Sequence, residues 1–97
     1  MSIRIVLFAC LLTNAAAAVA QTADPRLLSL SCAGCHGAGG HSPGSIPSLS
    51  GQDAAAIADS LRAFRAGRRP ATVMDRIAKG YTDAEIDAVA QEIAGWK

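Results

Sequence analysis

The amino-acid sequence predicts an all-α fold of three to four short helices in one small domain, on three observations. Asp24-Pro25 and Thr82-Asp83-Ala84-Glu85 are both sequences that start helices. Apolar residues recur at intervals of three and four within residues 57–64 and 86–93, as they do on one helix face. No stretch of the sequence carries a clear strand signal. We therefore expect helices alone to build the core.

The first twenty residues are predicted to be a secretory signal peptide and not part of the fold. Arg4 supplies the positive charge, residues 5–12 the apolar core, and Ala18-Val19-Ala20 the small-residue cleavage site. This apolar run is too short to be a transmembrane span. We expect cleavage after Ala20, a mature domain of residues 21–97, a periplasmic location and no stable membrane insertion. Cys10 would be removed with the leader.

The first helix of the mature chain is expected to begin at Asp24-Pro25 and to run into Cys32-Ala33-Gly34-Cys35-His36. Asp is a favoured N-cap, and proline at the first helical position loses no hydrogen bond. Two cysteines three residues apart lie on one helix face, roughly 5–6 Å apart at their Cβ atoms, so both can be tethered to one rigid planar ligand. The ligand indicated is one haem c, attached through thioethers from Cys32 and Cys35, with His36 as an axial ligand of the iron.

Three other interpretations of this motif have less support. A thioredoxin-type redox pair needs a strand, helix and strand around it, and no such context is present. A structural zinc site needs four ligands, whereas only the motif and the nearby His41 offer any. A disulfide between Cys32 and Cys35 would close a very small loop and leave His36 without a role.

Residues 37–51 are rich in Gly, Pro and Ser and are expected to form an irregular loop. A loop of this length in so small a domain usually has a task, and we expect it to wrap one edge and one face of the haem. Leu49 is placed to touch the ring. A carbonyl of the loop could accept the Nδ1–H of His36 and so fix its tautomer. A plain turn is the alternative.

A second helix is expected over residues 52–66, with Ile57, Leu61 and Phe64 on one face. Its opposite side is expected to be basic. That basic group is either a solvated face or one that meets haem propionates or an acidic partner. Its members are Arg62, Arg65, Arg68 and Arg69.

Met74 is the candidate for the other axial ligand, because it is the only methionine left once Met1 is removed with the leader. Pro70 prevents a helix from continuing into this region. One helix and a loop separate Met74 from the cysteine motif, which lets a short chain pass around the ring and return to its other face. A lone methionine is more often core filler. His41 is the rival ligand, but it lies too near His36 in sequence to cross the ring plane easily.

The closing helix is expected to start at the capping box Thr82-Asp83-Ala84-Glu85. Its apolar stripe is expected to pack across the first helix, with Trp96 near the end of the chain. The stripe consists of Ile86, Val89, Ala90 and Ile93.

Together these motifs resemble the class I cytochrome c family over essentially the whole mature chain. Residues 32–36 are similar to its haem-binding motif, Pro47-x-Leu49-x-Gly51 to its loop on the proximal side, and Met74 to its distal ligand. The resemblance implies an all-α domain wrapped around one covalently bound haem c. It also implies that the carbonyl of Pro47 holds the axial histidine.

Residues 42–52, 63–74 and 76–81 more narrowly resemble the cytochrome subunits of flavocytochrome c sulfide dehydrogenases. Those subunits accept electrons from an FAD-bearing flavoprotein that oxidises sulfide, so the resemblance implies such a partner. Many have two haem domains, whereas this chain has one motif and resembles the single-haem form. Glu92 stands where the wider family usually has an aromatic residue, and Trp96 could take over its packing.

The function expected from these features is periplasmic electron transfer by a c-type cytochrome, without catalysis by this chain alone. The expected partner is the FAD-containing flavoprotein subunit of a sulfide dehydrogenase. The alternative is a free-standing shuttle to a terminal oxidase or another dehydrogenase. A haem protein that binds gas or reduces peroxide would require Met74 to be detached. Nine basic and eight acidic residues provide no basic footprint for nucleic acid.

Overall fold

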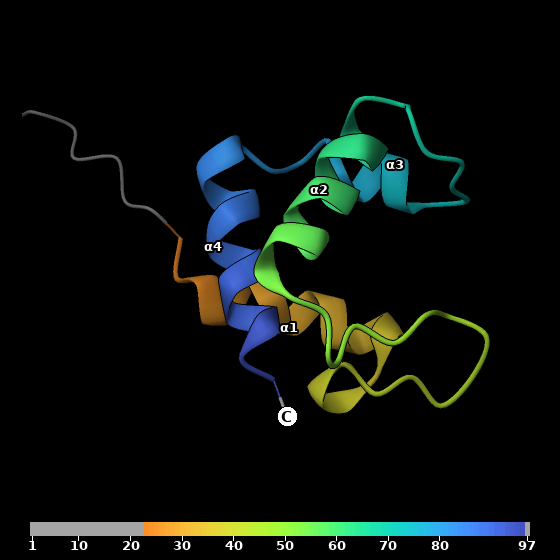
Figure 1. Ribbon diagram of the computed structural model, residues 1–97, viewed down its shortest axis with the longest axis vertical. Helices are drawn as coiled ribbons and strands as arrows, with labels where there is room; N and C mark the ends of the chain where they lie inside the picture. The colour runs from red at the N-terminus through yellow and green to blue at the C-terminus, as the bar shows by residue number, and fades with distance from the viewer. Residues whose placement is uncertain (1–22, 97) are drawn as a thin grey trace, which may run out of the picture.

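A computed structural model describes residues 23–96, and this part of the chain contains helices and no strand (Figure 1). The all-α prediction is therefore confirmed. The predicted signal peptide lies outside the described residues, so its boundary at Ala20 stays a prediction. Within residues 23–96 no helix has the length and apolar character needed to cross a bilayer. The elements are α1 (Pro25–His36), the 3₁₀ turn η1 (Ala38–Gly40), α2 (Ala54–Arg65), α3 (Met74–Ala78) and α4 (Asp83–Ala94).

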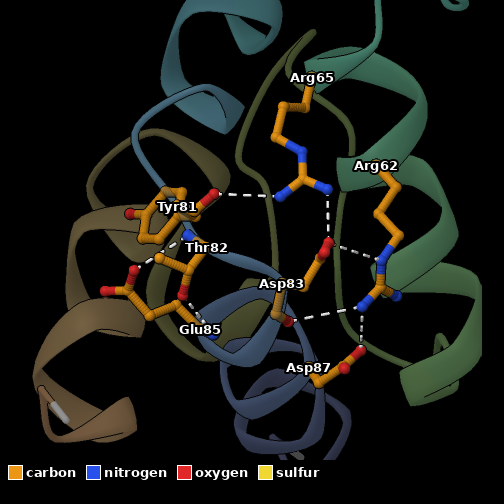
Figure 2. Close-up of polar contacts among 7 residues, drawn as sticks. All are labelled: Arg62, Arg65, Tyr81, Thr82, Asp83, Glu85 and Asp87. Carbon is orange, nitrogen blue, oxygen red and sulfur yellow. Dashed lines mark hydrogen bonds and ion pairs between the residues drawn. The ribbon is translucent and has the colours of Figure 1, made fainter.

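The two predicted helix starts are both present. The Asp24 carboxylate accepts a hydrogen bond of 2.9 Å from the backbone N–H of Arg26, at the start of α1. At α4 the Thr82 hydroxyl accepts from the Glu85 N–H at 3.2 Å, and the Glu85 carboxylate accepts from the Thr82 N–H at 2.9 Å (Figure 2). This reciprocal pair is the predicted capping box.

Two helix boundaries differ from the sequence expectation. Helix α2 begins at Ala54, two residues later than expected, because the Asp53 carboxylate caps it by accepting from the Ala56 N–H at 2.7 Å. Helix α3 was allowed for by the prediction of three to four helices, but its position was not predicted. It has only 5 residues, which is too short for an apolar periodicity to show in the sequence.

The core lies mainly between α2 and α4, and α1 packs across α4 (Figure 1). Trp96 is half-buried against this core. The whole predicted stripe of α4 is buried, together with two residues of α2. These core residues are Ile57, Ala58, Ile86, Val89, Ala90 and Ile93.

Candidate functional site

The two cysteines of the motif lie on the last turns of α1, and neither forms a disulfide. Cys32 is half-buried against the core, and this burial raises the pKa of its thiol. Cys35 is exposed. One thiol therefore faces the packed interior and the other faces solvent, so a planar group tethered to both would lie along the side of α1.

His36 is the last residue of α1, and its imidazole is bound to the loop that follows. The Nδ1 atom of His36 lies 2.5 Å from the carbonyl oxygen of Pro47. A carbonyl can only accept a hydrogen bond, so Nδ1 carries a proton, and in the neutral ring Nε2 then keeps its lone pair. This is the tautomer that a metal-ligating histidine uses, with an outer hydrogen bond that orients the ring. The contact implied by the resemblance, between His36 and the Pro47 carbonyl, is present.

Gly40 closes the base of the loop that carries Pro47. Its carbonyl accepts hydrogen bonds from the N–H groups of Leu49 (2.8 Å) and Ser50 (3.1 Å). Gly40 is buried with φ 77°, and a Cβ built on it would lie 2.9 Å from the Ser50 nitrogen and 3.2 Å from the ring of Trp96. From the sequence we expected only that this glycine lies in an irregular loop, so its part in shaping the site was missed.

Leu49 is half-buried and packs against the core cluster, while Pro47 is exposed. The loop is therefore attached to the domain in two ways, through the packing of the Leu49 side chain and through the backbone hydrogen bonds to Gly40. The loop brings the Pro47 carbonyl to His36 across a sequence separation of 11 residues.

Met74 is half-buried at the first position of α3, and α3 packs against α2. It therefore comes from a different element than His36, on a segment that leaves the C-terminal end of α2 (Figure 1). The sequence predicted a helix and a loop between His36 and Met74, and α2 and its flanking loops lie between them in the structure.

Large apolar side chains are exposed on the segments that carry the candidate ligands. Ile46 is next to Pro47 and is 43% exposed, Val73 is next to Met74 and is 52% exposed, and Ile77 of α3 is 43% exposed. Exposed apolar surface beside candidate ligands is what a porphyrin would cover. Two thiols, an imidazole with a free Nε2, a thioether and this surface together fit a covalently attached haem.

The zinc interpretation is not supported within residues 23–96, where no three His, Cys, Asp or Glu side chains gather as metal ligands. His41 is exposed, and its Nδ1 lies 3.2 Å from the Ser50 hydroxyl. The cysteines and histidines of the motif region therefore do not converge on one point.

The four arginines of the predicted basic group differ in their contacts. Arg62 and Arg65 form ion pairs with α4, through Asp83 and Asp87 (Figure 2). These bonds lower the pKa of Asp83, through Arg65 first and Arg62 second. In the segment after α2, the Arg69 guanidinium stacks over the Phe64 ring at 4.7 Å, and Arg68 is exposed. The four arginines therefore have separate environments, which their sequence spacing did not reveal.

The helical fold and this donor set together define the class of small all-α haem proteins. The profile of the cytochrome c family matches residues 17–93. The chain therefore belongs to the cytochrome c family. Membership of this family implies covalently bound haem c and electron transfer as the function.

Three curated relatives are similar to parts of the chain. It is 50% identical to the cytochrome subunit of sulfide dehydrogenase of Chlorobaculum tepidum over 66 residues, which make up 68% of this chain and 60% of that protein. It is 40% identical to the thiosulfate dehydrogenase electron acceptor of Stutzerimonas stutzeri over 67 residues, 65% of this chain and 31% of the relative. It is 41% identical to cytochrome c-552 of Acidithiobacillus ferridurans over 59 residues, 61% of this chain and 26% of the relative. The matched stretch spans less than two thirds of each relative.

Proposed function

We propose that the chain is a single-haem electron carrier whose iron is held by His36 and Met74, with the haem attached through Cys32 and Cys35. The bound group would supply the Fe(III)/Fe(II) couple. The chain's own residues would orient the imidazole, supply a thioether and cover the ring. Methionine ligation raises the potential relative to two nitrogen ligands, and two filled axial positions leave no open site for catalysis. The number of haems is taken from the single Cys-x-x-Cys-His motif in the sequence.

The observation that carries this proposal is the 2.5 Å contact between His36 Nδ1 and the Pro47 carbonyl. It leaves Nε2 as the one ring nitrogen able to bind iron. It also raises the donor strength of that nitrogen and fixes the ring plane. Leu49 would touch the ring from the same loop.

The preferred donor is an FAD-containing flavoprotein that oxidises sulfide, in the periplasm, with this chain as its cytochrome subunit. The similarity to the cytochrome subunit of sulfide dehydrogenase supports this donor. A free-standing shuttle that serves another dehydrogenase is the second candidate. The similarity to a protein named thiosulfate dehydrogenase electron acceptor favours it.

The axial assignment is tested by spectra of the purified mature protein and of Met74→Ala. We expect the native protein to be low-spin and to show the sulfur-to-ferric-iron band when oxidised. When reduced, it should not bind carbon monoxide. Met74→Ala should lose the band, bind carbon monoxide and have a lower potential. Arg76→Ala is the matched control, because it truncates an exposed side chain of the same short helix without removing a candidate iron ligand, and it should keep the band. An unchanged potential in Met74→Ala would exclude this ligand.

The choice of donor is tested by co-purification. Tagged mature protein is isolated from cells grown on sulfide, and the complex is checked for FAD and for cytochrome reduction by sulfide. A stable flavoprotein complex that reduces this chain supports the subunit role. Recovery of a monomer that is reduced only by other dehydrogenases supports the shuttle.

A further inference from the structure

The segment that carries Met74 connects α2 to α4, and its short helix α3 packs chiefly against α2. Its helix α3 is 5 residues long, far below the length at which a helix is stable by itself. Val73 and Ile77 are 52% and 43% exposed, and Ala78 is the one residue of α3 that is fully buried. Segments with few buried apolar contacts are those that open locally at low free energy. Contacts at the two ends of the segment therefore add to the packing of α3 against α2 in holding Met74 in place.

The beginning of this segment is tied back onto α2. The Arg69 guanidinium stacks over the Phe64 ring at 4.7 Å and donates a hydrogen bond of 2.9 Å to the Ser60 hydroxyl. The backbone N–H of Arg68 also donates to the carbonyl of Ala63 at 2.9 Å. These contacts fix the chain before it reaches Met74.

The end of the segment is held by Tyr81, whose side chain packs against the core, and by one side chain of α2, Arg65. Its Nη1 donates to the backbone carbonyl of Tyr81 at 3.2 Å, and its Nη2 donates to the Asp83 carboxylate at 2.5 Å (Figure 2). The planar guanidinium can make both bonds at once because its donors have a fixed fork geometry. The Tyr81 bond is partly buried. One group thus joins the last residues of the Met74 segment to the first residue of α4.

We propose that Arg65 is a positioning residue for the Met74 ligand. By holding the Tyr81 carbonyl, it fixes the exit of the segment while the contacts of Arg69 fix its entry, and Met74 lies between the two. Loss of the Arg65 fork lets the segment move away and leaves the iron open for a larger fraction of the time. This inference rests on the proposed function, because it assumes that Met74 is an axial ligand.

Arg62 provides a matched comparison one helical turn earlier. Its guanidinium donates to the Asp87 carboxylate at 2.7 Å and to the Asp83 carboxylate and carbonyl at 3.4 Å (Figure 2). All of these acceptors belong to α4, and none belongs to the Met74 segment. The side chains of Arg62 and Arg65 are equally exposed, at 30% and 29%. Both arginines therefore tie α2 to α4, but only Arg65 reaches the end of the segment.

The test uses the haem-loaded mature protein with Arg65→Ala and Arg62→Ala, and titrates the ferric form with imidazole, which competes with Met74 for the iron. The apparent dissociation constant for imidazole is inversely proportional to the fraction of molecules with an open iron. Loss of a charge-assisted hydrogen bond should raise that fraction by about tenfold. We therefore expect imidazole to bind about tenfold more tightly to Arg65→Ala, with a weaker sulfur-to-iron band, while Arg62→Ala stays within about threefold of the native protein.

Thermal unfolding of both variants is measured alongside, because both lose ion pairs between α2 and α4. Comparable melting temperatures with imidazole affinity changed only in Arg65→Ala would support the inference. Equal imidazole affinities in the two variants would overturn it and leave Met74 ligation standing. A native protein without the sulfur-to-iron band would overturn the proposed function and this inference together.

A second variant covers the case in which Arg65→Ala does not fold. Arg65→Lys keeps a positive charge beside Asp83, but a single ammonium lacks the two-armed fork. We expect imidazole to bind about threefold more tightly to Arg65→Lys than to the native protein. An unchanged affinity in that variant would overturn the proposed role of the fork.

Discussion

Replacing Gly40 with alanine should damage the loop that holds His36, and Gly51 offers a close control. Gly40 has φ 77° and Gly51 has φ 79°, so alanine meets the same left-handed backbone at both positions. The surroundings differ. A Cβ on Gly40 would lie 2.9 Å from the Ser50 nitrogen, 3.2 Å from the Trp96 ring and 3.3 Å from the Leu49 carbonyl carbon, whereas a Cβ on Gly51 meets nothing within 4 Å.

The expected losses of stability follow from the left-handed backbone and from the space around the added Cβ atom. The left-handed backbone costs a non-glycine residue roughly 1–2 kcal/mol, and Gly51→Ala should lose about that much stability. Gly40→Ala carries the same cost and adds overpacking against backbone atoms, which is worth roughly 1–3 kcal/mol. We therefore expect the free energy of unfolding to fall by about 2–5 kcal/mol in Gly40→Ala. The added loss corresponds to a melting temperature at least about 4 °C below that of Gly51→Ala.

The assay is urea unfolding of the two haem-loaded variants, followed by circular dichroism, with thermal unfolding as a second readout. Gly40→Ala has a local consequence as well. The Leu49 and Ser50 N–H groups must shift away from the Gly40 carbonyl, which should loosen the His36–Pro47 contact. Equal stability losses in the two variants would refute the reasoning, because they would show that the close approach of Gly40 to the loop has no energetic weight.

Two further predictions concern the core and the effect of pH. Ile86 is fully buried, so Ile86→Ala should destabilise the protein by about 2–5 kcal/mol, whereas Leu27→Ala, at a residue that is 68% exposed, should change stability by no more than about 0.5 kcal/mol; urea midpoints of the two variants check this. Hydrogen bonds lower the pKa of Asp83, from Arg65 first, and of Glu85, from the Thr82 N–H first. A carboxylate with a lower pKa in the folded state stabilises above its unfolded pKa, so this stability is present at neutral pH and is lost as the pH falls below about 4. The free energy of unfolding of Asp83→Asn should therefore decrease less than that of the native protein as the pH is lowered. An identical decrease in the two proteins would count against this account.

Much of the fold follows from signals a few residues long. The helix start at Asp24-Pro25 and the capping box at Thr82 are satisfied within one helical turn, so the sequence alone located them. The buried stripe of α4 follows from the helical period. The cysteine and histidine motif likewise occupies a single turn, so its spacing was enough to indicate a shared planar ligand.

What the sequence alone did not determine depends on contacts between distant residues. Helix α3 is too short to produce a periodic signal, and the tight approach of Gly40 depends on Ser50 and Trp96, which local propensity does not describe. The separation of Arg62 and Arg65 from the other arginines depends on how α2 packs against α4.

The sequence by itself indicated which residues are candidates for the chemistry and determined where most helices begin, because those properties arise from neighbours along the chain. The tertiary structure alone decided which groups meet. Pro47 reaches His36 across 11 residues, and Arg62 reaches Asp87 across 25. A side chain that can make a hydrogen bond or an ion pair is evident from its chemistry, but its partner is set by how the helices pack.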